Sequence, residues 1–591
     1  MQTFSRHLRV LRHFPLAYPP VAKVELVPPG GARPAGGLAR QQRQPSLAGR
    51  ERGLVAACEK SLARPEAPSR QKGLSFQGRR ANPWTMNSLT LSRRQFIHST
   101  SCTLGSGWLG LHSAFGAPGE AEVWEPDRPF ARLGGKLKLQ PVFMYSLPSR
   151  KEAASWRSWG GVQTEQGVAE ELARIQRELA QMAGRAEFGV ELLPLAKVTS
   201  VEAVRRLAAE QWDVTLVYAC TGGGAVLRAC LELRPESVVF VRQRSGPVYY
   251  WYEALSTQYL RTDAAAAASP SAGRLPAHVE DVVVDDYGEL LWRLRALHGA
   301  KSFLGTRIVA LGGPGGKYAP DAPQKSQERF GLEIIEVSYD EFAPRIQQAL
   351  GDREVMARAE RWAQRYLALP HTTQRTERKF VVNAFVLYRL FKELMREHAA
   401  PAFTIQACMS TIIPMAQTTA CLPLALLNDE GLIAFCESDF VIIPAGLLLR
   451  YIAGKPVFLH NSTFPHQGMV TCAHCTCPRR MDTRHYESVQ LLTHYESDYG
   501  AAPKVEMPLG QELTFVDPEY SKARWLGFKG TVQANPAYAI CRSQQDVLLA
   551  GAWQRLIPEV RDSHWVTAYG DYLKELGYAA RKLGVQWVSL A

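Results

Sequence analysis

The feature that most constrains the fold is an alternation of short apolar segments with amphipathic ones between residues 138 and 350. Apolar runs such as 213–220 and 237–243 are bounded by polar or turn residues, which is typical of strands buried in a parallel sheet. Strands and helices in regular succession predict doubly wound α/β units. In the helix expected over 166–183, the apolar face consists of Val168, Leu172, Ile175, Leu179 and Met182.

The chain changes in character after Gly454, where short apolar segments are separated by Pro, Gly and Asp turns. This pattern is typical of an antiparallel, barrel-like domain, and a short helical tail over 570–583 is expected to close it. A chain of 591 residues is too long for a single core. We therefore predict an α/β fold with two Rossmann-like doubly wound α/β domains at 136–296 and 297–455, followed by a β-rich, barrel-like C-terminal domain at 456–591.

One apolar segment, over 439–454, has to be tested as a membrane span. It is shorter than a bilayer requires, and it carries Asp439, Pro444 and Arg450. We therefore expect a buried core helix there and no stable membrane span in the chain.

Positive charge is concentrated at the beginning of the chain. Residues 1–85 hold 15 Lys and Arg against 4 Asp and Glu, a net charge of +11 out of the chain's +13, so the rest carries only +2. A nearly neutral body offers no surface that follows a phosphate backbone, and we expect no nucleic acid as a partner. Residues 1–85 are rich in Arg, Pro, Gly and Gln. We interpret them as disordered, or as an extension upstream of a true start at Met86.

A targeting signal is predicted at 86–117. The run Ser92-Arg93-Arg94-Gln95-Phe96-Ile97 matches the twin-arginine pattern, and a weakly apolar stretch with small residues near Ala117 follows it. The interpretation implies the twin-arginine export machinery as a partner and an exported, periplasmic protein. The alternative is a chance Arg pair in a cytoplasmic protein.

The cysteines do not describe a disulfide framework. There are 11 of them, an odd number at irregular spacing, and Cys220 and Cys436 lie in apolar strand-like runs that favour buried free thiols. The cluster 472–477 (Cys-Ala-His-Cys-Thr-Cys) is a candidate zinc site. Successive residues of a strand face opposite sides, however, and no second ligand pair is evident. We favour His474 as a single metal ligand with buried cysteines beside it, and keep the four-ligand zinc site as an alternative.

Two glycine-rich turns follow predicted strands, at 221–224 and 312–317. Glycine allows a backbone to approach a ligand closely. Neither turn has the spacing of a nucleotide-binding motif, so no nucleotide cofactor is expected. The interpretations left open are a tight strand-to-helix turn and a neutral sugar near the loop.

The most informative stretch is the end of the apolar strand over 432–436, where Glu437 and Asp439 follow directly. Ligands of α/β sheets sit at the carboxyl ends of strands, and two carboxylates there can hold a divalent cation or move protons. The alternative is helix capping, with Ser438 as the N-cap and Asp439 in the first turn. For Glu437 a functional role is favoured, while for Asp439 both interpretations stay open.

The run Cys436-Glu437-Ser438-Asp439, the apolar helix ending at Gly454 and the segment Lys455-Pro456-Val457-Phe458-Leu459 resemble the fucose/arabinose isomerase superfamily. The resemblance extends over roughly 138–591. It implies an aldose–ketose isomerase that acts on a pentose or deoxyhexose through a cis-enediol, with Mn²⁺ as the cofactor. It also implies a homo-oligomer, either a trimer or a hexamer.

The same resemblance implies the ligands. Glu437 takes the position of the metal-binding glutamate, which is also a candidate base, and His474 that of the metal-binding histidine. Where the family carries a ligand aspartate, this chain has His460 and Asn461. Asp439 or Glu430 is then the candidate to replace the missing carboxylate as a base. This departure motivates an alternative function, an exported sugar-binding protein without catalysis on the isomerase scaffold.

Overall fold

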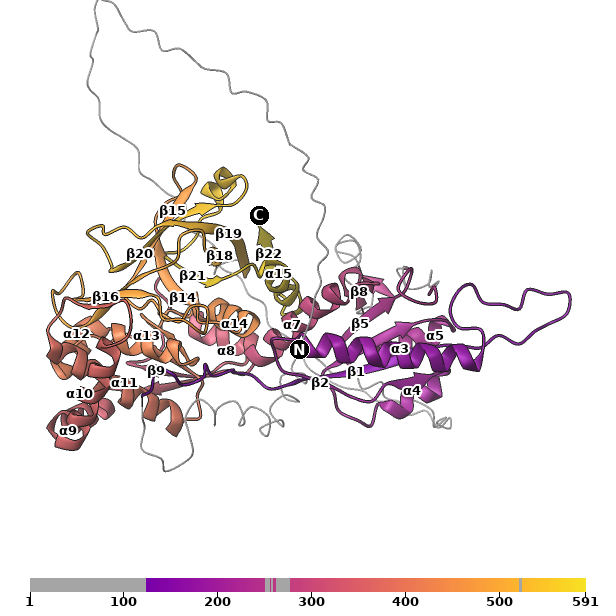
Figure 1. The fold of residues 1–591 in the computed structure, drawn as a ribbon, viewed down its shortest axis with the longest axis horizontal. Coiled ribbons are helices and arrows are strands. Elements are labelled where there is room, and N and C mark those ends of the chain that lie inside the picture. Colours follow the sequence, from indigo (N-terminus) through magenta and orange to yellow (C-terminus); the bar gives the residue numbers. More distant parts are fainter. Residues whose placement is uncertain (1–123, 250–255, 257–258, 262–276, 520–522, 591) are drawn as a thin grey trace, which may run out of the picture. The chain divides into compact units, whose positions relative to one another are not determined.

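The computed structural model describes residues 124–249, 256, 259–261, 277–519 and 523–590 (Figure 1). The predicted extension at 1–85 and the predicted export signal at 86–117 lie outside these residues.

The first α/β part is built on a parallel sheet. Its main elements in chain order are β1 (Leu137–Met144), α3 (Glu165–Gly184), β2 (Val190–Leu192), β3 (Ala196–Val198), α4 (Val201–Leu207), β4 (Val214–Ala219), α5 (Gly224–Leu231), β5 (Glu236–Val241), β8 (Val282–Val284) and α7 (Tyr287–Phe303). The strand order is β2-β1-β4-β5-β8, and β3 pairs with a further stretch of β1. The short strands β6 (Leu260–Arg261) and β7 (Ala277–His278) pair separately.

Helix α3 shows how the sequence pattern produces this sheet's cover. Thr164 caps the helix because its side chain accepts a hydrogen bond from the Gly167 amide. Val168, Ile175, Leu179 and Met182 are buried, and Leu172 packs against the same core, so the predicted apolar face is confirmed. The parallel sheet is confirmed as well, while its Rossmann-like character and the boundary at 296 stay predictions.

The second α/β part has a parallel sheet of order β10-β9-β12-β13. Its elements are β9 (Arg307–Leu311), α8 (Ala322–Phe330), β10 (Glu333–Val337), α9 (Tyr339–Gly351), α10 (Arg353–Leu367), α11 (Arg378–Glu397), β12 (Ala402–Ile405), α12 (Cys408–Ala416), α13 (Cys421–Asp429), β13 (Ile433–Phe435) and α14 (Ile443–Ala453). Because all four strands are parallel, the loops that follow β9, β12 and β13 leave the sheet at the same edge.

Helix α14 is shorter than predicted. It begins at Ile443 after an N-cap at Ile442, while Asp439 forms a β-bridge with Gly315 and residues 440–442 form a turn instead of the first turn of the helix. The prediction of a buried core helix is confirmed, since residues 443–452 are all buried. No single helix among the described residues is long and apolar enough to cross a membrane. Helices α12 and α13 pass such a test of length and composition only together, across a 94° bend.

The C-terminal part contains a closed, six-stranded antiparallel barrel, as the sequence predicts. Its strands are β14 (Phe458–Ser462), β15 (Met469–His474), β18 (Glu512–Glu519), β19 (Arg524–Ala534), β20 (Ser543–Leu549) and β21 (His564–Tyr569). The order is β18-β21-β14-β15-β20-β19, and pairing of β18 with β19 closes the barrel. In the colours of Figure 1 these strands run from orange to yellow.

Two details of the C-terminal prediction are wrong. The expected helical tail does not close the chain, because α15 (Leu573–Lys582) is followed by β22 (Gln586–Ser589), which pairs in parallel with β19. The predicted strands near 489 and 503 are present but lie outside the barrel. They form β16 (Ser488–Leu492) and β17 (Ala502–Glu506), which make a separate sheet with β11 (Thr372–Gln374).

Helix α14 connects the second sheet with the barrel. Gly446 allows the close approach, because a Cβ there would lie 2.7 Å from Phe435 Cε1 and 3.3 Å from Val566 Cγ1. Phe435 is the last residue of β13 and Val566 belongs to β21. Both side chains are buried in one apolar core with α14. This packing fixes the end of β13 close to the start of β21, where the candidate site lies.

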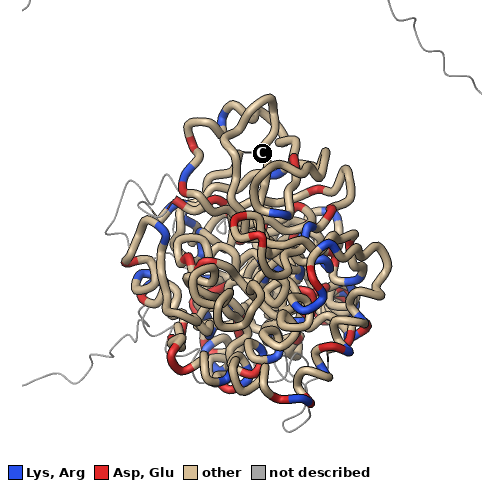
Figure 2. Tube along the Cα trace, turned by 90° about the vertical axis from the view of Figure 1, so that its left-hand side faces the viewer, with Lys and Arg blue, Asp and Glu red and all other residues tan. Residues whose placement is uncertain are grey.

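Basic and acidic residues are interspersed along the described chain in the view of Figure 2. This mixture is consistent with the small net charge of the chain beyond residue 85.

Candidate metal centre

The glycine-rich loop after β9 and the segment after β13 form one structural unit, although about 120 residues separate them and β12 lies between their strands. Gly315 donates its amide to Ser438 O at 3.0 Å, and Phe440 donates its amide to Gly315 O at 2.9 Å. The Ser438 hydroxyl donates to Gly313 O at 2.9 Å. These bonds hold the backbone around Glu437 against the loop.

The backbone at Glu437 is strained, and the loop contacts hold it in place. Glu437 has φ of 66° and Ser438 has φ of 50°, both in the left-handed region. Each such residue costs about 1–3 kcal/mol, and such residues persist where the surrounding structure fixes them. The alternative interpretation of Ser438 and Asp439 as helix caps is wrong, because α14 begins only at Ile443 and its N-cap is Ile442.

The glycines of the loop are explained by close packing. A Cβ at Gly312, which has φ of +81°, would lie 2.5 Å from Tyr339 Cε2, and a Cβ at Gly316 would lie 2.2 Å from Ala319 O. The amides of Gly315 and Lys317 already donate to Ser438 O and Asp439 Oδ1. The loop is therefore a tight strand-to-helix connection, and those two amides are engaged within the protein.

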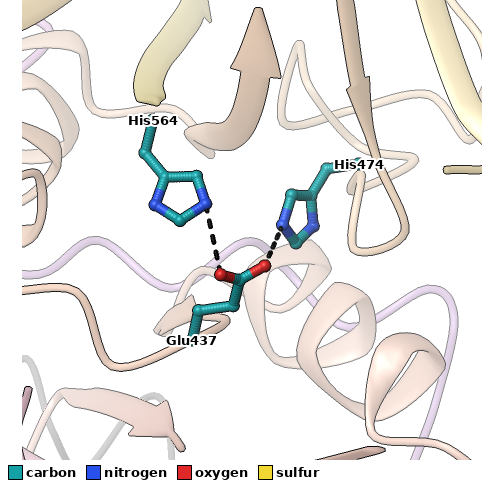
Figure 3. A group of neighbouring side chains, drawn as sticks. All are labelled: Glu437, His474 and His564. Carbon is teal, nitrogen blue, oxygen red and sulfur yellow. Dashed lines mark ion pairs between the residues drawn. The ribbon is translucent and has the colours of Figure 1, made fainter. Parts of the chain in front are cut away.

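Three side chains from three elements converge on one point. Glu437 follows β13, His474 ends β15 and His564 begins β21 (Figure 3). His474 Nε2 lies 3.4 Å from Glu437 Oε1, and His564 Nε2 lies 3.4 Å from Glu437 Oε2. One ligand atom from each residue lies within 4.8 Å of the other two. The arrangement is compatible with a carboxylate and two imidazoles around one cation.

The two imidazole nitrogens that face Glu437, His474 Nε2 and His564 Nε2, are buried. Within the described part of the chain they make no hydrogen bond, because their contacts with the carboxylate are ion pairs without hydrogen-bond geometry. Buried polar atoms are normally satisfied, so two such atoms beside one carboxylate indicate a missing partner. A cation between the three groups would satisfy all of them. The donor set therefore fits a metal ion.

Asp439 orients His564. Its Oδ2 lies 2.7 Å from His564 Nδ1, while its Oδ1 accepts the amides of Lys317 at 3.2 Å and Val441 at 3.1 Å. Such a carboxylate holds the proton on Nδ1 and leaves Nε2 as the ligand atom. Asp439 is buried behind the imidazole. It therefore acts on the centre through His564.

The protonation of the three side chains favours the binding of a cation. Burial opposes ionisation of Glu437, but the contacts with His474 and His564 outweigh it and lower the pKa of this carboxyl below its usual range. Burial lowers the pKa of His474, and the carboxylate of Glu437 only partly offsets this effect. Burial also lowers the pKa of His564, but the contacts with Asp439 and Glu437 raise it to a net value above 6.5. An ionised carboxylate thus faces one neutral imidazole and one that binds a proton more readily.

The open side of the centre is occupied by Lys317. Its Nζ lies 3.1 Å from Glu437 Oε2. The side chains of Lys317 and Glu437 are 34% and 38% exposed, whereas those of His474 and His564 are 4% and 0% exposed. A ligand from solvent therefore reaches the centre along the side of Glu437 and Lys317.

The two candidates for a third ligand lie beside this group and not within it. His460 is buried, and its Nδ1 lies 3.0 Å from Ser462 Oγ, while burial lowers its pKa to about 3. It does not belong to the group of three. Asn461 is paired in register with His564 on β21 and with Ala473 on β15, so it flanks the centre. The prediction of His460 and Asn461 as ligands stays a prediction.

His564 is the residue that sequence reasoning missed. It is the first residue of the run His-Trp-Val-Thr-Ala-Tyr, which forms the fully buried strand β21. The run is not among the strands that the sequence predicts, and nothing in the local sequence marks the histidine as a ligand.

Two other candidates lie elsewhere. Cys472, Cys475 and Cys477 are buried free thiols outside the group of three, so nothing in the described chain supports a four-ligand zinc site there. The expectation of buried free thiols is confirmed for these and for Cys220 and Cys436. Glu430 is buried, pairs with Lys392 and accepts a hydrogen bond from the Tyr388 hydroxyl. These contacts show that Glu430 belongs to a buried ion pair, and they do not support a role for it as a base.

Comparison with models of known protein families gives no match for this chain, and comparison with curated proteins gives no significant match.

Proposed function

We propose that this protein is a metal-dependent aldose–ketose isomerase-like enzyme that acts on a pentose or deoxyhexose through a cis-enediol. The observation that carries the proposal is the convergence of Glu437, His474 and His564 on one point at the carboxyl end of β13. The resemblance of the surrounding motifs to the fucose/arabinose isomerases supports the reaction class, and so does the order of two α/β parts with parallel sheets followed by a barrel. Mn²⁺ is the proposed cofactor, and this mixed oxygen and nitrogen donor set is compatible with it.

Each residue has a separate task in this proposal. A bound divalent cation would polarise the carbonyl and hydroxyl oxygens of a sugar. Glu437, His474 and His564 hold the cation, and Asp439 fixes the ring of His564. Transfer of a proton between adjacent carbons needs a base within hydrogen-bond reach of the sugar, and partly exposed Glu437 is the candidate, while Asp439 lies behind the imidazole.

The remaining expectations are proposals of the same kind. We propose export by the twin-arginine route to the periplasm, with a monosaccharide as the substrate and a homo-oligomeric assembly, either a trimer or a hexamer.

The direct test is proton exchange at the sugar. The Mn²⁺-loaded full chain is incubated in D₂O with a panel of pentoses and deoxyhexoses, and NMR follows ketose formation and deuterium at C2. We expect both signals for the wild type and for His485→Ala, since His485 is an exposed histidine paired with Asp482 away from the centre. Glu437→Ala should abolish both. Absence of exchange with every sugar, in protein that holds the metal, would contradict isomerase activity.

A second candidate function is an exported sugar-binding protein without catalysis. The observation that favours it is the small number of carboxylates at the centre. Glu437 is the only carboxylate in the group of three, and Asp439 is hydrogen-bonded to His564. Asn461 stands where the family resemblance leads us to expect a carboxylate. Saturable binding of a sugar without exchange at C2 would identify this function.

A further inference from the structure

Lys317 is held at the metal centre by its backbone as well as by its charge. Its amide donates to Asp439 Oδ1 at 3.2 Å, and the neighbouring Gly315 is bridged to the same segment. The side chain then reaches Glu437 with Nζ 3.1 Å from Oε2, the same oxygen that faces His564 Nε2. The lysine therefore pairs with the carboxylate that would also hold a cation.

An isolated, partly exposed ion pair contributes little to stability, so stability does not explain a lysine at this place. Its effect on the centre is larger. A divalent cation and Lys317 bring three positive charges, and Glu437 and Asp439 bring one negative charge each, with both imidazoles neutral. One positive charge remains in excess on the side that is open to solvent.

We infer that Lys317 turns from Glu437 to a ligand oxygen when the cation binds, and that the centre therefore selects ligands with an anionic oxygen over neutral polyols. The inference rests on the proposed metal-dependent function and specifies its ligand class. A cation held by Glu437 would repel the ammonium of Lys317, and the partly exposed lysine side chain can turn away from the carboxylate by rotation about its bonds. For an isomerase, the ligand with anionic oxygen is the enediolate that forms between aldose and ketose.

This charge arrangement also gives Lys317 an effect on metal binding itself. In the metal-free protein the ammonium competes with a cation for Glu437, so its removal increases the affinity for Mn²⁺. The same removal weakens the binding of an anionic ligand to the loaded protein. The two effects have opposite signs, which a general disturbance of the loop does not produce.

The test uses the full-length protein and calorimetry. Acetohydroxamate is the anionic probe, because its deprotonated form carries one negative charge on two oxygens bonded to neighbouring atoms, as an enediolate does, and ribitol is the neutral probe. The variants are Lys317→Met, which removes the charge at similar length, and Lys317→Arg, which keeps it. Lys325→Met is the matched control, since Lys325 on the neighbouring helix α8 pairs with Asp321, the N-cap residue of that helix.

In the Mn²⁺-loaded protein we expect Lys317→Met to lower the affinity for acetohydroxamate by about tenfold or more, because the variant loses a charge-assisted hydrogen bond to this ligand. Ribitol binding should stay within about twofold, and metal affinity should rise. Lys317→Arg and Lys325→Met should retain the wild-type preference for the anion.

The outcomes separate the two proposals. Wild-type protein that binds no Mn²⁺ contradicts both the proposed function and this inference. Protein that binds Mn²⁺ but shows the same acetohydroxamate affinity in the wild type and in Lys317→Met contradicts only the role of Lys317. An equal decrease of the affinities for acetohydroxamate and ribitol in Lys317→Met also contradicts the role of Lys317, because the effect would then not depend on the charge of the ligand.

Discussion

Replacement of Asp439 by Asn tests how the centre is oriented. The Oδ1 atom of Asp439 accepts two backbone amides, from Lys317 at 3.2 Å and Val441 at 3.1 Å. An Asn side chain keeps these bonds only when its oxygen takes that position, which turns its NH₂ group toward His564 Nδ1. The imidazole then accepts through Nδ1 and carries its proton on Nε2, the atom that faces Glu437. This is the wrong tautomer for a metal ligand.

The expected magnitude follows from this geometry. Loss of a partner that orients a ligand typically lowers metal affinity by about 10- to 100-fold, or roughly 1.4–2.7 kcal/mol. Because the two amides enforce the wrong tautomer, we expect Asp439→Asn to reach the upper end, about 100-fold. The overall fold should persist, since the backbone bonds around Asp439 are retained.

The assay is a calorimetric titration of the metal-free protein with Mn²⁺, and circular dichroism checks the fold. Asp482→Asn is a matched control, because Asp482 has the same arrangement at the surface. Its Oδ2 lies 2.6 Å from His485 Nδ1, and its Oδ1 accepts the amides of Arg484 and His485. The control should bind Mn²⁺ like the wild type. Wild-type affinity in folded Asp439→Asn would refute the proposed orientation of His564.

Further predictions concern pH, the flanking residues and a buried ion pair. Mn²⁺ affinity should fall as pH decreases through the pKa of His564, which contacts with Asp439 and Glu437 raise above its usual value, because a proton on Nε2 competes with the cation; calorimetric titrations at a series of pH values check this dependence. His460→Gln tests the predicted ligand role of His460: because this residue is buried outside the group of three, we expect a lower melting temperature and unchanged metal content, and unchanged metal content would show the ligand role to be wrong. Asn461→Asp should increase Mn²⁺ affinity by adding a carboxylate beside His564, which the same titration measures. Lys392→Met should destabilise the fold by about 3–5 kcal/mol in denaturant unfolding, because it leaves the buried carboxylate of Glu430 without its ion-pair partner, while metal content stays unchanged.

Periodicity was sufficient to predict the parallel sheets, helix α3 and the barrel. The face of α3 is marked by residues at helical spacing, and the strands of both sheets are short apolar runs. The local sequence pattern does not determine which strands pair with one another. Strands β16 and β17 are short apolar runs like the barrel strands, yet they form a separate sheet in which β16 pairs with β11, more than 100 residues earlier in the chain.

Only part of the site could be predicted, because a local sequence pattern does not show which distant residues come together. Glu437 could be proposed from its place at the end of a buried strand, and His474 from the resemblance to a known family. His564 could not, because its role depends on α14 bringing the start of β21 to the end of β13. The contact of the glycine-rich loop with Ser438 depends likewise on strand order in the second sheet. Both relations are set by tertiary packing.

The metal content of the full-length protein tests the central claim most directly. Plasma mass spectrometry is applied to wild-type protein and to Glu437→Ala, His474→Ala, His564→Ala and the surface control His485→Ala. The account predicts about one divalent ion per chain in the wild type and the control, and its loss in each of the three variants. A folded wild type without metal, or full metal content in His564→Ala, would contradict it.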